Sequence, residues 1–184
     1  MMKYNAPIQM IAVLLCGIGN RYLYAEDSTL YFFMPGITWA IALLLPILKY
    51  SFDTKFALVL FPMANMVLWF LGLALSATFG TLMFAASPLF VFPLVGAIGA
   101  LCAYLLYAKL VLDVVERKDA FICMVLGYAS FMLYMFVNYN GSYKVAIEGL
   151  FVYWQPFVGL GCVIAHVRRM NSLRQNPTPL TDAS

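Results

Sequence analysis

The longest uncharged stretch of the chain is the feature that most constrains its fold. Residues 56–108 contain no Asp, Glu, Lys, Arg or His and are rich in Leu, Phe, Ala, Val and Met. One helical crossing of a lipid bilayer needs about 20 apolar residues, so this stretch is too long for one span and suits two spans joined by a turn. Soluble domains carry about 25% charged residues, whereas this chain of 184 residues has 10% charged and 64% hydrophobic residues. The sequence therefore predicts an all-α, polytopic membrane protein.

Shorter apolar runs flank the long stretch and are separated from it by small polar or charged clusters. Together the runs predict six transmembrane helices, at residues 7–24, 30–48, 56–78, 88–115, 120–137 and 149–167. The first run could instead be a cleaved signal peptide. We expect it to be retained, because Leu23 is large where a small residue is preferred and Arg21 lies in the would-be cleavage region. Residues 79–87 are expected to form an uncharged turn. The predicted transmembrane domain covers residues 1–169. Residues 170–184 are polar and are expected to be a disordered tail.

The positions of the basic residues predict the orientation of the six helices. With an even number of spans, both termini lie on the same side of the membrane. Nine of the eleven Lys and Arg residues fall on that side, and only Arg21 and Lys144 fall on the other. Loops on the cytoplasmic side carry an excess of Lys and Arg. We therefore expect both termini, including the tail, to be cytoplasmic, in a multi-pass protein of the cell (inner) membrane.

Several function classes lack support in the sequence. Eleven basic residues scattered between apolar runs do not form the dense basic surface that nucleic acid requires. The four cysteines have no metal-type spacing, and the chain contains neither HExxH nor GxSxG. No Asp or Glu lies in the middle of a predicted span, which disfavours proton-coupled transport. We therefore expect no nucleic-acid partner, no cofactor, no metal site and no catalytic residue, and we favour a non-enzymatic role.

Uncharged polar residues inside the predicted spans are the candidate binding residues. Asn65 lies near the middle of its span and Gln155 in the outer third of another. An unsatisfied polar group in lipid costs several kcal/mol, as an order of magnitude, so both need partners, and the carbonyls freed by Pro62 and Pro156 are the nearest. Aromatic residues could complete a cavity, although interhelical hydrogen bonding and interfacial aromatics are the alternative. The predicted ligand site consists of Asn65, Gln155, Tyr104 and Trp154.

A stripe of small residues marks the fourth predicted span. Gly96, Gly99, Ala100 and Ala103 recur at helical spacing. Such stripes let helix backbones approach closely in lipid, where packing drives helix association. We therefore expect this helix at the centre of the bundle.

Three functions remain open from the sequence. The first is a non-catalytic subunit of a larger secretion or transport assembly, whose partners are the lipid bilayer and either other membrane-protein subunits or further copies of itself. The second is a small-molecule binding or transport protein with a neutral polar pocket. The third is a membrane enzyme that acts at the cytoplasmic face through His166 or through the acidic residues Asp113, Glu116 and Asp119.

Overall fold

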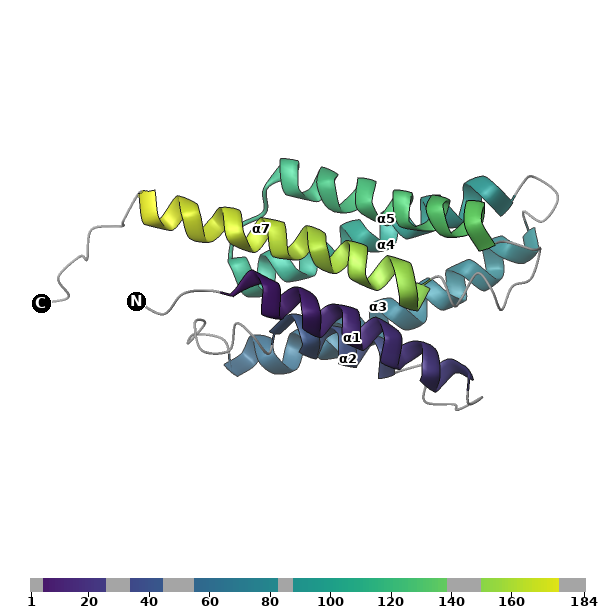
Figure 1. The fold of residues 1–184 in the computed structure, drawn as a ribbon, viewed down its shortest axis with the longest axis horizontal. Coiled ribbons are helices and arrows are strands. Elements are labelled where there is room, and N and C mark those ends of the chain that lie inside the picture. The colour runs from purple at the N-terminus through teal and green to yellow at the C-terminus, as the bar shows by residue number, and fades with distance from the viewer. Residues whose placement is uncertain (1–4, 26–33, 45–54, 83–87, 139–149, 176–184) are drawn as a thin grey trace, which may run out of the picture.

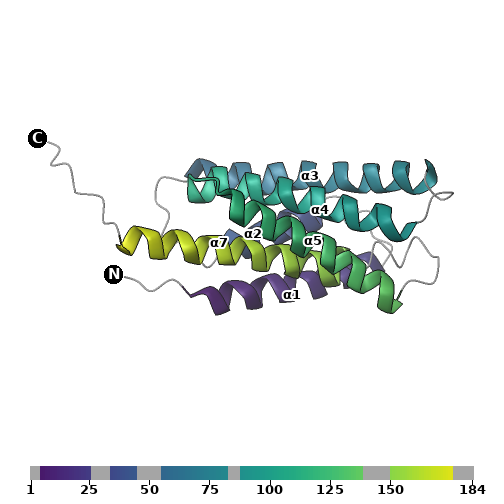
Figure 2. The same cartoon turned by 90° about the horizontal axis from the view of Figure 1, so that it is seen from above.

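The computed structural model describes residues 5–25, 34–44, 55–82, 88–138 and 150–175, and this part of the chain is helical without strands. The helices lie side by side along the long axis of the molecule, and successive helices alternate in direction (Figure 1). The beginning of α1 and the end of α7 lie at the same end of the bundle (Figures 1 and 2). The helices are α1 (Ala6–Ala25), α2 (Met34–Leu44), α3 (Lys55–Leu82), α4 (Pro88–Tyr107), α5 (Arg117–Asn138) and α7 (Gln155–Gln175). The all-α prediction is confirmed for these residues.

Each of these helices falls on one of the six predicted apolar runs, with differences at their ends. Helix α3 continues to Leu82 and so includes the start of the predicted turn at 79–87, of which residues 83–87 lie outside the described part. Helix α7 continues to Gln175, six residues past the boundary predicted at 169. No glycine or proline interrupts residues 168–175, and the first proline beyond them is Pro177, before which helical backbone is disfavoured. The rest of the predicted tail, residues 176–184, lies outside the described part.

Two of the described helices are long and apolar enough to cross a membrane. They are Phe92–Leu112, which joins α4 to the π-helical turn η3 (Ala108–Leu112), and Arg117–Phe136 of α5. Met34–Leu44 and Val59–Gly72 are apolar but shorter. Helices α1 and α7 are not among them, and both carry polar residues along their length, such as Gln9 and Asn20 in α1 and the arginines of α7.

The small-residue stripe of α4 forms the tight crossing of α4 with α5. A Cβ atom added to Gly127 would lie 2.5 Å from the carbonyl oxygen of Gly96 and 2.5 Å from Cβ of Ala100. Ala100 and Ala103 are fully buried. Gly99 differs from the other three, because a Cβ there would meet the indole of Trp154 at 3.2 Å. The stripe therefore packs helix on helix as predicted, while Gly99 borders a different feature.

The reversal of the chain between α4 and α5 is held by local hydrogen bonds. The π-helical turn η3 is followed by Asp113, whose φ of 52° is left-handed, and the N–H groups of Asp113 and Val114 both donate to the carbonyl of Ala108. The hydroxyl of Tyr104 accepts a hydrogen bond from the N–H of Glu116 at 3.1 Å and donates one to its carbonyl at 3.2 Å. One side chain of α4 thus fixes the residue that precedes α5.

Candidate ligand cavity

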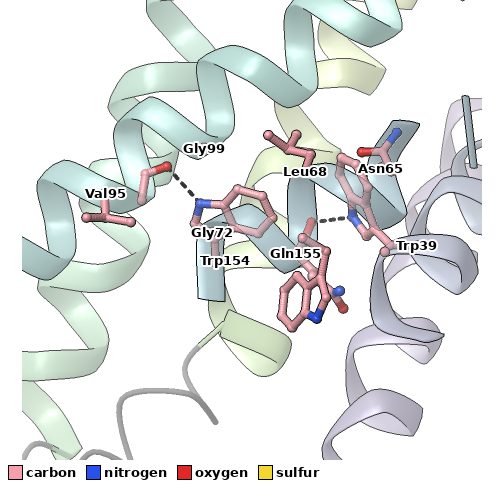
Figure 3. A pocket seen from close by; sticks show the side chains of 11 residues that line it. Trp39, Asn65, Leu68, Gly72, Val95, Gly99, Trp154 and Gln155 are labelled. Atoms are coloured by element: carbon pink, nitrogen blue, oxygen red, sulfur yellow. Dashed lines mark hydrogen bonds between the residues drawn. The ribbon is translucent and has the colours of Figure 1, made fainter. Parts of the chain in front are cut away.

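A small, partly open cavity lies between α2, α3, α4 and the junction of α7 with the π-helical turn η4 (Leu150–Trp154). Its volume is about 50 Å³. Figure 3 shows the side chains that surround it, which come from segments far apart in the sequence. The lining residues are Gly36, Trp39, Asn65, Leu68, Trp69, Gly72, Val95, Gly96, Gly99, Trp154 and Gln155. None of them is charged, so the cavity is neutral as well as small.

All three tryptophans of the chain line this cavity. The rings of Trp39 and Trp154 are tilted by 36° with their centroids 6.1 Å apart. The indole N–H of Trp39 donates to the carbonyl of Gln155 at 3.0 Å, and that of Trp154 donates to the carbonyl of Gly96 at 2.8 Å. Figure 3 marks both hydrogen bonds. Because these two nitrogens bind backbone carbonyls, Trp39 and Trp154 offer the cavity mainly carbon surface.

The side chain of Gln155 connects three helices. Its Oε1 accepts a hydrogen bond from Asn20 of α1 at 3.0 Å, and its Nε2 donates to the carbonyl of Pro35 of α2 at 3.2 Å. The hydroxyl of Thr38 in α2 lies 3.0 Å from Oδ1 of Asn20 and extends the network. The sequence suggested the carbonyl freed by Pro156 as the partner of Gln155. The observed partners come instead from α1 and α2. The oxygen and the nitrogen of the Gln155 carboxamide are therefore both engaged in hydrogen bonds within the fold.

Asn65 has a different hydrogen-bonding state. Its residue is only 3% exposed, and its Nδ2 donates to the carbonyl of Phe61, one turn earlier in α3, at 2.9 Å. This bond fixes the orientation of the carboxamide, because the carbonyl of Phe61 can pair only with the nitrogen. Asn65 Oδ1 accepts no hydrogen bond from the described residues, and because none of their fully buried side-chain oxygens or nitrogens lacks a partner, this atom is accessible rather than sealed in the wall. Figure 3 shows the carboxamide beside Leu68 and Trp39. The cavity therefore has a hydrogen-bond acceptor in a largely apolar wall.

The backbone of α2 passes close to this part of α3. A Cβ atom added to Gly36 would lie 2.5 Å from the backbone oxygen of Asn65 and 2.9 Å from Cβ of Trp69. Glycine is thus required for the approach that brings Trp39, one turn later in α2, against the cavity.

Three of the four residues predicted for the ligand site lie together, and the fourth does not. Asn65, Gln155 and Trp154 line the cavity, whereas Tyr104 is not among the lining residues. Tyr104 lies five residues after Gly99, the nearest lining residue of α4 in sequence, and its hydroxyl binds the backbone of Glu116 instead. The assignment of Tyr104 to the cavity is therefore corrected.

Trp39 and Trp69 line the cavity but were not assigned to a site from the sequence. Tryptophan in membrane proteins is enriched at the two interfaces. Both residues instead lie well inside their apolar runs, at residues 30–48 and 56–78. That position is the signal that could have placed them in the interior.

A second buried polar cluster lies toward the other end of the bundle. Gln9 Nε2 donates to the carbonyl of Leu43 and lies 3.3 Å from the hydroxyl of Tyr107, which lies 3.0 Å from Nδ1 of His166. His166 is 6% exposed, so it lies inside the bundle rather than among lipid headgroups. The cluster connects α1, α2, α4 and α7 and gives His166 a structural partner.

The acidic residues proposed with His166 for an enzyme are not in one environment. Asp113 and Glu116 are exposed, whereas Asp119, in the first turn of α5, is 3% exposed. Asp119 forms an ion pair with Arg168 of α7, with 2.5 Å between Oδ1 and Nη1. Among the described residues, no group of three or more His, Cys, Asp or Glu could hold a metal ion.

Comparison of the chain with protein-family models, with curated proteins and with solved structures finds no match.

Proposed function

We propose that this chain is an integral membrane protein with six spans and with both termini in the cytoplasm. The side chains that face outward are apolar on several helices, among them Leu15 of α1, Val59 of α3 and Phe136 of α5. The buried positions include the polar residues Gln9, Asn20 and Gln155. Apolar groups outside and hydrogen-bonded polar groups inside suit a lipid environment, where polar groups must find partners within the protein. The common end of α1 and α7 agrees with an even number of spans.

Within this frame, the function that the geometry supports best is the binding of a small, uncharged molecule, as a carrier or a receptor. The observation that carries the proposal is the convergence of Asn65, Trp154 and Gln155, from distant segments, on one neutral cavity. Ligand sites are typically apolar clefts with a few well-placed polar groups, and the Oδ1 atom of Asn65 is such a group.

Native mass spectrometry of the tagged chain, purified from its own membrane in a gentle detergent, tests this proposal. A single chain that carries a discrete small molecule would support it. The matched sample is Asn65→Leu, which removes the acceptor and keeps a side chain of similar size. Retention of the same molecule by Asn65→Leu at the same occupancy would remove Asn65 from the site. A single chain that carries only bulk lipid would count against ligand binding.

A second candidate function is that of a non-catalytic subunit in a larger membrane assembly. Its support is an open apolar groove of about 560 Å³ between α3 and α4, lined by residues such as Ala64, Leu71 and Cys102. An outward apolar groove would allow a helix of another subunit to pack against it, since packing drives helix association in lipid. The same mass measurement separates the two candidates, because stoichiometric protein partners would favour the subunit.

A further inference from the structure

We infer that the cavity receives the hydroxyl end of a lipid-soluble primary alcohol, with the rest of the molecule in the groove between α3 and α4. The inference rests on the proposed binding function and adds the chemical class of the ligand. It follows from the size of the cavity, from the hydrogen-bonding state of its polar atoms, and from the residue that the cavity shares with the groove.

The volume of the cavity limits what enters it. A dry cavity of about 150 Å³ in another protein accepts benzene, which has six heavy atoms. The cavity of about 50 Å³ is a third of that size and has room for about two heavy atoms. A hydroxymethyl group fits this space, whereas an aromatic ring does not.

The hydrogen-bonding state of the wall favours a donor. Asn65 Oδ1 accepts no hydrogen bond from the described residues. Among those residues no fully buried side-chain oxygen or nitrogen lacks a partner, so this oxygen is accessible, and a donor that enters the cavity can pair with it. A buried water molecule typically makes about three hydrogen bonds, but much of this wall is indole, Leu68, Val95 and glycine. A hydroxyl on a carbon chain suits this wall, because the hydroxyl donates one hydrogen bond to Asn65 and the attached carbon contacts the apolar side chains.

The wall offers an ionic head group no charged partner. None of the eleven lining residues is Asp, Glu, Lys or Arg. An unpaired ion in an apolar environment is strongly disfavoured. The donor is therefore a neutral hydroxyl rather than an ammonium group.

The route for the remaining carbon chain is given by Leu68. This residue lines the cavity and also lines the apolar groove of about 560 Å³, together with Ala64, Val67 and Leu106. A molecule whose head fills the cavity can pass Leu68 and lay its chain in the groove, where the lining is apolar. The bilayer therefore supplies the ligand from the side.

Intrinsic fluorescence reports on this site directly, because all three tryptophans line it. We would titrate the protein in lipid nanodiscs with 1-decanol, decanal and 1-chlorodecane, which differ in their ability to donate a hydrogen bond. The expected result is about tenfold tighter binding of the alcohol than of the other two, when concentrations are expressed within the bilayer; a buried hydrogen bond of ordinary strength gives a preference of this order.

Three variants make the titration specific. Asn65→Leu should remove the preference for the alcohol. Gly72→Leu should abolish the response, because Gly72 follows Asn65 by seven residues on the same helix face, lines the cavity, and has no atom within 4 Å of an added Cβ. The matched control is Gly19→Leu, at an exposed position of α1 that also has no atom within 4 Å. Gly19→Leu should behave as the parent protein, which excludes a general effect of alcohols on the bilayer.

The outcomes separate the inference from the function on which it rests. Equal binding of decanal and 1-decanol, blocked by Gly72→Leu, would keep the binding function and overturn the hydroxyl class. Saturable binding in the cavity of methylammonium, a cation with two heavy atoms, would overturn the requirement for an uncharged ligand. If none of these ligands gives a response that Gly72→Leu removes, both the binding function and the hydroxyl class are overturned.

A substitution in the groove tests where the alkyl chain of the alcohol lies. Ala64→Phe fills the groove from a position that does not itself line the cavity. It should weaken 1-decanol about tenfold and leave ethanol unchanged, since each buried CH₂ contributes about 0.8 kcal/mol. Equal binding of both alcohols by Ala64→Phe and the parent would overturn the lateral route and indicate a ligand that arrives from water.

Discussion

Gln155 and Asn65 are both buried amides, and their partners predict different effects on stability. Replacing Gln155 with Leu leaves the side-chain amide of Asn20 and the carbonyl of Pro35 without the partner that now joins three helices. We expect Gln155→Leu to lower the free energy of unfolding by about 1–2 kcal/mol, the upper part of the range for interhelical hydrogen bonds in membranes. Unfolding in a detergent–SDS mixture, followed by circular dichroism, measures this change.

Asn65→Leu serves as the comparison. In the parent protein the one hydrogen bond of Asn65 runs to Phe61 in the same helix. Asn65→Leu should therefore lower the free energy of unfolding by less than half as much as Gln155→Leu. A larger loss for Asn65→Leu would mean that Asn65 is a structural residue rather than a ligand-binding one.

At the scale of residues, the sequence predicts which polar groups matter but not where each one lies. Asn65 and Gln155 stand out because amides are costly in apolar runs. Their partners, Phe61 for one and Asn20 with Pro35 for the other, depend on helix rotation and on which helices are neighbours, and neither follows from spacing along the chain. Tyr104 was assigned to the cavity by residue type alone, whereas its hydroxyl binds the backbone of Glu116.

The crossing of α4 and α5 is the clearest prediction at the scale of helices. A side chain at Gly127 would collide with the backbone of Gly96 and with Ala100. We expect Gly127→Val to cost about 1–3 kcal/mol, as overpacked interiors generally do, and to lower the level of protein in the membrane. Gly19→Val is the control, because nothing lies within 4 Å of its added Cβ. Equal stability of the two variants would contradict the tight crossing.

The ion pair of Asp119 and Arg168 joins α5 to α7 at one end of the bundle. Asp119 is buried while the side chain of Arg168 is 48% exposed. Arg168→Gln leaves the buried carboxylate without its partner and should cost about 1–2 kcal/mol, less than the 3–5 kcal/mol for a fully buried pair. In a double-mutant cycle measured by the same unfolding assay, adding Asp119→Asn should recover part of this loss. Additive effects of the two substitutions would show that the pair contributes nothing to stability.

The positions of the helices were largely predictable from apolar runs, whereas their ends were not. Hydropathy locates each described helix, because a long apolar segment is unfavourable in water regardless of which helices pack against it. The extension of α7 to Gln175 depends on the absence of helix breakers and is accompanied by the Arg168 ion pair, which hydropathy does not register. The π-helical turns η3 and η4 likewise depend on local backbone bonding, such as the two N–H groups that converge on Ala108.

At the scale of the molecule, the proposed orientation makes a direct prediction. Lys118, at the start of α5, is exposed and belongs to the side that carries nine basic residues, while Lys144 belongs to the other side. In a cysteine-free background, a membrane-impermeant maleimide applied to intact cells should label Lys144→Cys and should label Lys118→Cys only after lysis. Labelling of both in intact cells would contradict the six-span topology.

The bond between the Tyr104 hydroxyl and the backbone of Glu116 has a consequence for how the protein is made. It joins residues only 12 positions apart at the reversal between α4 and α5. Contacts between residues near in sequence form early, because they require little loop closure. We therefore expect α4 and α5 to leave the ribosome, pair and enter the bilayer as one helical hairpin. The remaining helices would then assemble around this hairpin, and the cavity would close only when the junction of η4 and α7, which follows the hairpin in the chain, reaches it.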